Sequence, residues 1–267
     1  MSKYEEAVPI LEELTTLQSH KDLGTMLIMI ECFIQLGREK KAEKIIENLR
    51  NILRTSSVTS ADDVKTLAIE MISNSAYIRA MILLRISSDM YKAESRSPND
   101  VINWIELCVS NMDDATEGII GAGGRSRIIG IDYGIEYMTE MLDDLRPVKN
   151  ADPVIKALAE AKCSNYIGYN YGLTGEYDKC IKICINGQVV MEKQFGSNAS
   201  KYRIYGLLLH NIGVGNYNLL KYSRAKSFYI RAVDAKQNAT DYEDAAEREN
   251  DIDRSKSDLE NTRAKLT

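Results

Sequence analysis

Two stretches of the chain decide the fold: residues 163–189 read CSNYIGYNYGLTGEYDKCIKICINGQV, and residues 211–235 read NIGVGNYNLLKYSRAKSFYIRAVDA. At a fixed offset of 45 residues they match in glycines, tyrosines and small residues, in the pairs Gly168/Gly213, Tyr177/Tyr222, Cys180/Ala225 and Cys184/Tyr229. A period between 20 and 50 residues is typical of proteins built from stacked supersecondary units. The unit here is too short for a domain, so the match predicts an array.

The sequence around these stretches predicts helices throughout. Apolar residues recur every three to four positions along almost the whole chain, as in segments 41–53, 101–112 and 128–145, and strand-type alternation is nearly absent. Only four prolines occur. Breaks are predicted at Gly37, 54–60, 95–99, 121–124, 147–153, Gly175 and 196–199. We therefore expect an all-α chain of about a dozen helices.

The matched positions resemble those of the tetratricopeptide repeat, a hairpin of two helices. In that family, small residues let the two helices approach and aromatic residues fill the gap to the next hairpin. The resemblance assigns close approach to Gly168, Gly213, Cys180 and Ala225, and filling to Tyr171, Tyr177, Tyr222 and Tyr229. The chain departs from the pattern at Asn216, where an aromatic residue is expected, and at Gly187, where alanine is usual.

The N-terminal part of the chain shows the same resemblance. Tyr4, Ala7, Leu11 and Leu14 are similar to the second helix of a repeat, and segment 32–49 is similar to a whole repeat. Weaker matches follow at 77–84 and 115–122, and no register is assigned to 125–160. The resemblance implies a right-handed superhelical solenoid of tetratricopeptide-like hairpins over residues 1–237.

The last residues differ from the rest. Residues 241–267 carry nine acidic and five basic side chains, and Ala245, Ile252, Leu259 and Leu266 recur every seven residues. The positions midway are polar, so the apolar stripe is narrow for a coiled coil. We expect residues 238–267 to form a charged C-terminal helix that caps the solenoid, as stacked repeats require. A helix that dimerises or binds a partner is the alternative.

Composition and charge narrow the function. The net charge of −5 disfavours a nucleic-acid binder driven by phosphate contacts. The N-terminus does not resemble a signal peptide, and the longest uncharged stretch, 204–220, holds His210 and several asparagines and glycines, so no membrane span is expected. Five cysteines, without a CxxC pair, are typical of reduced, mostly buried thiols. These features predict a cytoplasmic protein.

The sequence offers no catalytic constellation. Only two histidines are present, His20 and His210, which excludes a histidine-rich metal site. The glycine-rich segment 118–124 follows a helical segment and lacks the lysine of a P-loop, so we interpret it as a hinge. Cys180 and Cys184 fall at core positions of the repeat. We expect neither an enzyme nor a cofactor or metal.

Binding is the function that the resemblance implies. In the family, the first helices of successive hairpins line a concave groove. Its groove-facing positions correspond to Lys162, Asn165, Tyr166 and Tyr169 in one repeat, and to His210, Asn211, Tyr217 and Asn218 in the next. Asparagine at position 211 is typical of members that hold the main chain of a ligand, since an amide both donates and accepts. The basic residues of the family's carboxylate-binding members are mostly missing.

A second apolar surface is predicted near the N-terminus, at Met26, Leu27, Met29, Ile30 and Ile34. It is expected either to accept an amphipathic helix or to be covered by the chain's own first helix. The sequence as a whole predicts a protein–protein interaction adaptor or scaffold subunit that holds a partner peptide or helix in its groove. A structural subunit of a larger assembly and, less favoured, an enzyme or small-molecule regulator on a helical scaffold are the alternatives.

Overall fold

The structure is a computed structural model that describes residues 3–17, 22–55, 60–94, 96–122 and 124–266. These residues contain twelve α-helices, one 3-10 helix and no strand. The helices are α1 (Lys3–Leu17), α2 (Leu23–Gln35), α3 (Glu39–Thr55), α4 (Ala61–Ser73), α5 (Tyr77–Ala93), α6 (Pro98–Ala122), α7 (Gly124–Leu145), α8 (Pro153–Thr174), α9 (Tyr177–Phe195), η1 (Gly196–Lys201), α10 (Arg203–Asn218), α11 (Tyr222–Asn238) and α12 (Ala245–Ala264). The all-α prediction is confirmed.

The predicted breaks at Gly37, 147–153 and Gly175 lie between helices, whereas the turns at 74–76 and 219–221 had no predicted break. Asp152 accepts hydrogen bonds from the backbone amides of Val154 and Ile155, and Pro153 occupies the first turn of α8. Gly175 ends α8 in the left-handed conformation, with φ +80°. The predicted hinge at 118–124 is helical up to Ala122 and again from Gly124. His20 and residues 56–59 of the predicted break lie outside the described residues.

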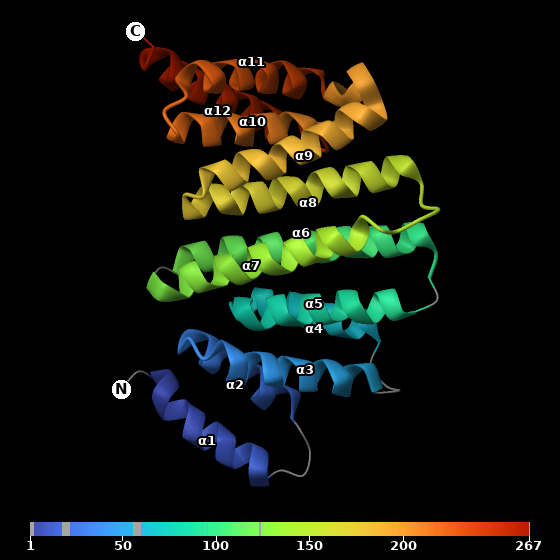
Figure 1. The fold of residues 1–267 in the computed structure, drawn as a ribbon, viewed down its shortest axis with the longest axis vertical. Helices are drawn as coiled ribbons and strands as arrows, with labels where there is room; N and C mark the ends of the chain where they lie inside the picture. The colour runs from blue at the N-terminus through green and yellow to red at the C-terminus, as the bar shows by residue number, and fades with distance from the viewer. Residues whose placement is uncertain (1–2, 18–21, 56–59, 95, 123, 267) are drawn as a thin grey trace. The chain divides into compact units, whose positions relative to one another are not determined.

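The chain divides into two compact units, and each is built from two segments. One unit comprises residues 1–96 and 110–137, and the other comprises residues 97–109 and 138–267. In the second unit α8 packs against α9 and α10, α10 against α9 and α11, and α11 against α12. These helices follow one another as a stack of hairpins (Figure 1). The fold class is therefore an all-α helical repeat of the solenoid type.

Two glycines allow the helices of these hairpins to approach closely. A Cβ on Gly168 of α8 would overlap the Sγ of Cys184 on α9. The equivalent Cβ on Gly213 of α10 would lie 2.7 Å from the ring of Tyr229 on α11. Each glycine faces the residue sixteen positions later. The predicted close approach therefore recurs at the 45-residue offset, with a thiol in one hairpin and a phenol ring in the other.

The two departures from the repeat pattern have local packing reasons. Gly187 replaces the usual alanine because a Cβ there would lie 2.9 Å from both Leu208 on α10 and Ser164 on α8. Asn216 replaces an aromatic residue and is buried, and its Nδ2 donates to the carbonyl of Ile212 at 2.8 Å. The amide thus uses the backbone of its own helix as its partner.

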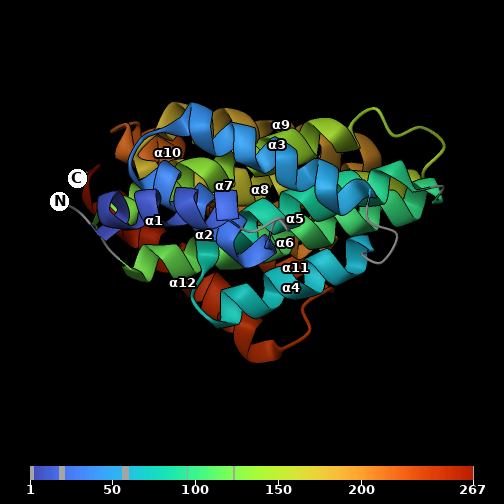
Figure 2. The same cartoon turned by 90° about the horizontal axis from the view of Figure 1, so that it is seen from below.

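The first unit contains α1–α5 and the adjoining parts of α6 and α7. Within it α2 packs against α1, α3 and α5, and α4 packs against α5, as can be followed in Figures 1 and 2. Ser60 and Asp63 form a capping box that begins α4. Gly118 of α6 lies against the ring of Tyr77 on α5, and Gly134 of α7 against Thr116. Segment 110–137 therefore contributes directly to the packing around α5.

Two sequence predictions about the side chains and the helices can be compared with this fold. The five cysteines are unpaired and buried, as expected of reduced thiols. Among the described residues, none of the helices combines the length and apolar character that crossing a membrane requires.

Candidate partner-binding surface

The predicted site residues lie on two neighbouring first helices of the second unit. Lys162, Asn165 and Tyr169 lie on α8, and His210, Asn211, Tyr217 and Asn218 lie on α10. The two helices pack against each other, so residues 45 or 46 positions apart come within reach. We refer to this part of the molecule as the α8–α10 face.

Polar side chains link consecutive first helices across this face. Lys162 of α8 forms an ion pair with Glu106 of α6. Asn211 of α10 donates from Nδ2 to the Oδ1 of Asn165 on α8, at 3.0 Å. His210 of α10 and Ser255 of α12 share a hydrogen bond of 3.0 Å between Nδ1 and Oγ. Together these three polar contacts connect α6, α8, α10 and α12, and we refer to them as the polar ladder.

The amide pair is the centre of the ladder. Asn165 and Asn211 are both buried, with 8% and 9% of their surface exposed. An asparagine amide offers two donor hydrogens and a two-fold acceptor. The bond between them uses one hydrogen of Asn211 and one lone pair of Asn165. Among the described residues, no other hydrogen bond is made by the NH2 group of Asn165 or the side-chain carbonyl oxygen of Asn211, and a donor beside an acceptor is what one peptide unit pairs with.

The remaining predicted residues differ in exposure. Lys162, Tyr166 and Tyr169 are half-buried on α8. Tyr217 packs edge-on against Tyr222, with ring centroids 5.4 Å apart, at the turn between α10 and α11. Asn218 is exposed, and its Nδ2 donates to the carbonyl of Val214 at 2.9 Å. The structure therefore brings Asn165 and Asn211 together and places Tyr217 and Asn218 at the C-terminal end of α10.

His210 lies under α12 rather than on an open surface. Only 3% of it is exposed, its ring centroid lies 5.5 Å from that of Tyr229, and its Nε2 lies 3.6 Å from the Oδ2 of Asp258. Burial, with the nearby charges of Lys236 and Arg254, lowers the pKa of the imidazole well below its usual value. The ring is therefore neutral at pH 7, and α12 separates it from any ligand on the α8–α10 face.

A buried lysine holds α12 in place. Lys236 of α11 is 1% exposed, and its Nζ donates to the carbonyl of Asp251 at 2.9 Å and to the Oγ of Ser255 at 3.0 Å. Burial lowers the pKa of this ammonium to about 8. Arg203 of α10 adds an ion pair, from Nε to the Oδ2 of Asp251, at 3.0 Å. The Tyr242 hydroxyl donates to the same oxygen at 3.1 Å.

Sequence inspection overlooked this cluster because a lysine in the last turn of a helix is usually exposed. One signal was present in the sequence. Position 206 of α10 requires glycine to leave room for the aliphatic part of the Lys236 side chain. A Cβ on Gly206 would lie 2.6 Å from the Cγ of Lys236. A glycine inside a helix at this place could have indicated a bulky neighbour.

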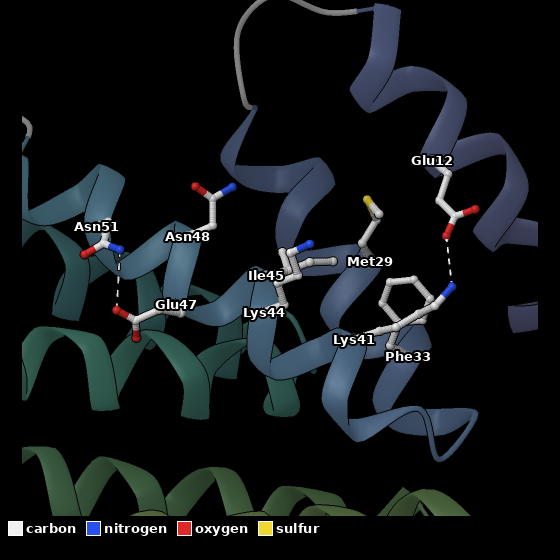
Figure 3. Close-up of a pocket in the computed structure, with 9 residues that line it drawn as sticks. All are labelled: Glu12, Met29, Phe33, Lys41, Lys44, Ile45, Glu47, Asn48 and Asn51. Atoms are coloured by element: carbon white, nitrogen blue, oxygen red, sulfur yellow. Dashed lines mark hydrogen bonds and ion pairs between the residues drawn. The ribbon is translucent and has the colours of Figure 1, made fainter.

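The apolar surface predicted near the N-terminus is buried. Met26, Leu27, Met29, Ile30 and Ile34 are each at most 6% exposed, and α1 packs against α2. Two expectations were stated for this surface, a bound amphipathic helix or the chain's own first helix. The contact between α1 and α2 agrees with the second. A groove lined by residues of α1, α2 and α3 lies beside it, and Figure 3 shows these residues.

Comparison with known proteins supports the fold. No protein-family model and no curated protein sequence matches the chain. Among solved structures, the apo form of RapI superposes with a TM-score of 0.52, over 99% of this chain and 69% of RapI. The two sequences are 14% identical, so the likeness concerns the arrangement of helices alone.

Proposed function

We propose that the protein is a protein–protein interaction scaffold that binds a peptide or helix of a partner on the α8–α10 face. The observation that carries the proposal is the linked amide pair Asn165–Asn211, whose second donor and acceptor, without another partner among the described residues, are of the kind that a peptide backbone needs. Half-buried Tyr166 and Tyr169 on α8 add apolar area with polar tips, which binding surfaces favour.

We further assign the hairpins to the tetratricopeptide type. The 45-residue offset and the recurring glycine contacts at Gly168 and Gly213 support this assignment. In such a solenoid the first helices line the concave side, and Lys162, Tyr169, Tyr217 and Asn218 then belong to the binding groove. Residues 238–267 act as the cap, since α12 packs on the last hairpin. His210 contributes by holding that cap.

The charge of the face favours a ligand read by its main chain. Lys162, the basic residue predicted here, is paired with Glu106, so it offers little attraction to a carboxylate ligand. An uncharged or mixed-charge segment is therefore expected to bind. We expect a non-enzymatic protein of the cytoplasm, with no cofactor and no nucleic-acid partner, in line with the acidic net charge and the reduced thiols.

A structural subunit remains the second candidate because α9 exposes apolar side chains. Ile185 and Val189, one turn apart, are 38% and 53% exposed. Neighbouring exposed apolar residues on one helix are typical of surfaces that a larger assembly covers. In that case partner binding depends on α9, and substitution of Asn165 and Asn211 does not change it.

A pull-down from cell lysate with an Asn165→Ala/Asn211→Ala variant tests the proposal. Replacing both members leaves no unpaired amide, so the fold should survive with a small loss of stability. The matched control is Asn186→Ala/Asn238→Ala, which removes two exposed amides from α9 and α11. Partners bound by the wild type and the control, and lost by the first variant, support the α8–α10 face. Partners retained by both variants contradict it, and loss on Val189→Glu instead would favour the structural subunit.

A further inference from the structure

The C-terminal helix α12 is attached to the second unit mainly by polar contacts. Its buried residues are Ser255, Leu259 and Thr262. Of these, Leu259 joins an apolar cluster, with Ala225 and Tyr229 of α11. The hairpins formed by α8 to α11 are held differently, because they share larger apolar clusters in which α8 packs with α9 and α10, and α10 with α11. The docking of α12 therefore depends on the hydrogen bonds around Ser255.

One hydroxyl group bonds two nitrogens in this contact. The Oγ of Ser255 lies 3.0 Å from the Nδ1 of His210 on α10 and 3.0 Å from the Nζ of Lys236 on α11. Each of the three residues is at most 3% exposed. Since both nitrogens lie 3.0 Å from the same oxygen, they are at most 6.0 Å apart. Two positive charges at this separation repel each other more strongly in a buried site than in water.

The hydrogen atoms of the cluster fit a neutral imidazole. An ammonium group only donates, so Lys236 occupies one lone pair of the Ser255 hydroxyl. The single hydrogen of that hydroxyl can go to the Nδ1 of His210 or to the carbonyl of Asp251, at 3.2 Å. A protonated ring must donate from Nδ1, and the hydroxyl then turns to Asp251. Hydrogen bonding can therefore follow protonation, and the obstacle to it is the second buried charge.

The ring of His210 faces more positive than negative charge. Lys236 and the ring of Tyr229 approach it from α11, and Arg254 and Asp258 approach it from α12. The Oδ2 of Asp258 lies 3.6 Å from Nε2, which is longer than a hydrogen bond, and within the described parts of the chain Nε2 has no hydrogen-bond partner. Burial, followed by the charges of Lys236 and Arg254, lowers the pKa of the imidazole well below 6.5.

The other contacts of α12 do not involve His210. The carboxylate of Asp251 accepts from Arg203 of α10 at 3.0 Å and from the hydroxyl of Tyr242 at 3.1 Å. Ahead of α12, the backbone amide of Thr240 donates to the carbonyl of Lys201 at 2.9 Å. These contacts connect the start of α12 to the second unit, and we expect their contribution to be similar at pH 7.5 and pH 5.5.

We propose that α12 is a cap whose docking is controlled by the protonation of His210. A proton on the ring places an imidazolium beside the Lys236 ammonium in the buried cluster. Undocking of α12 brings both groups into water and removes this repulsion, while α8 to α11 stay stacked through their apolar clusters. Acid thereby shifts α12 from the docked to the undocked state and uncovers the side of α11 that carries Ala225 and Tyr229.

Amide hydrogen exchange on the full-length protein tests the proposal. If the docked ring stays neutral and the undocked ring has the usual pKa of 6.5, the docking equilibrium falls about tenfold between pH 7.5 and pH 5.5. The protection factors of the α12 amides, which are corrected for the intrinsic exchange rate at each pH, should fall by the same factor. Those of α9 should stay unchanged and serve as the internal control.

Three variants identify the groups responsible. In His210→Gln the protection factors of α12 should be equal at the two pH values. His20→Gln is the matched control, since it removes the other histidine of the sequence, and it should keep the tenfold fall. Lys236→Met keeps the aliphatic part of the side chain and removes its charge, so the fall should be smaller than in the wild type.

The ring itself provides a second measurement that does not depend on the folding of His210→Gln. The chain has two histidines, so the imidazole resonance that remains in His20→Gln belongs to His210. Its chemical shift should remain that of a neutral ring until the protection of α12 begins to fall.

The proposal is overturned if His210 titrates near pH 6.5 while α12 stays protected, because the ring is then protonated in the docked state. It is also overturned if the protection factors of α12 in the wild type are equal at both pH values, or if they fall tenfold in His210→Gln or in Lys236→Met. None of these variants changes Asn165 or Asn211, so failure here is distinct from failure of the proposed function.

Discussion

Glycines of α8 illustrate how single residues define the hairpin. Gly168 and Gly172 lie one turn apart on the same helix, but their surroundings differ. A Cβ on Gly168 would overlap the Sγ of Cys184, whereas the nearest atom to a Cβ on Gly172, the Sγ of Cys180, lies 4.0 Å away. Close approach to α9 therefore requires glycine only at position 168.

Gly168→Ala should lower the free energy of unfolding by about 1–3 kcal/mol, because the added methyl group overpacks the contact between α8 and α9. Gly172→Ala should raise it by up to about 1 kcal/mol, since alanine favours the helix and has space there. Urea unfolding of both variants measures the difference. Equal effects of the two substitutions would contradict the packing that we describe.

His210 gives the protein a defined response to acid. Its folded pKa is lowered by burial, so the unfolded chain binds more protons below pH 6.5. Stability is therefore expected to fall as the pH decreases below this value. The nearby positive charges of Lys236 and Arg254 increase the effect, and the Oδ2 of Asp258 lies 3.6 Å from the Nε2 of the ring.

In His210→Gln the loss of stability that results from protonation of His210 should disappear. Between pH 7 and pH 5 the free energy of unfolding of the wild type should fall more steeply than that of the variant, by at most about 1.4 kcal/mol per pH unit. Chemical denaturation at a series of pH values provides both slopes. Parallel slopes would mean that His210 keeps its usual pKa in the folded protein.

At the scale of the helix, α12 shows why an apolar pattern alone misplaces a buried face. Its sequence suggests a stripe of Ala245, Ile252, Leu259 and Leu266, but the buried residues are Ser255, Leu259 and Thr262. Ser255 is polar because it bonds Lys236 and His210, whose nitrogens need partners, whereas the Thr262 hydroxyl donates to the carbonyl of Asp258 in its own helix. A helix held by hydrogen bonds cannot be recognised from apolar spacing.

Asp251→Asn should loosen α12, because it weakens the ion pair with Arg203 that joins α12 to α10. A loss of about 1 kcal/mol corresponds to roughly fivefold faster hydrogen exchange of the α12 amides. Asp253→Asn is the matched control: it removes an exposed pair with Lys256 within the same helix. Exchange that is equally fast in both variants would show that Asp251 does not anchor α12.

For the whole molecule, local signals in the sequence were sufficient for the helices and insufficient for their assembly. Helical periodicity, the N-cap at Asp152 and the glycine at 175 determine where α8 begins and ends. The 45-residue offset between Gly168 and Gly213 could be recognised in the sequence because each glycine packs against one side chain of the following helix. The ion pair of Lys162 with Glu106 and the burial of Lys236 depend on residues distant in sequence, and no periodic pattern marks them.

The division into two units was also hidden from the sequence. Its boundaries fall after residues 96, 109 and 137, and the last two lie inside α6 and α7 rather than in polar linkers. A continuous helical period crosses both boundaries. Composition therefore gives no sign of them.

Fragments test this division. A fragment of residues 1–137 includes segment 110–137, which covers Tyr77 on α5, and should melt in a cooperative transition. A fragment of residues 1–96 lacks that cover and should melt broadly, with lower helicity. Circular dichroism during heating distinguishes the two. A sharp transition of the shorter fragment, at the same temperature, would mean that segment 110–137 is dispensable for the first unit.

The two units are interleaved along the chain, and this affects when each can complete its packing during translation. A ribosome adds about 5–20 residues per second, and a domain usually folds once its last residue has emerged. Here the first unit lacks part of its packing until residue 137 is made, when residues 97–109 of the second unit have already been synthesised. Those residues must wait for their partners while translation continues. A nascent chain halted between residues 97 and 137 is thus expected to expose to a chaperone apolar surface that the completed first unit buries.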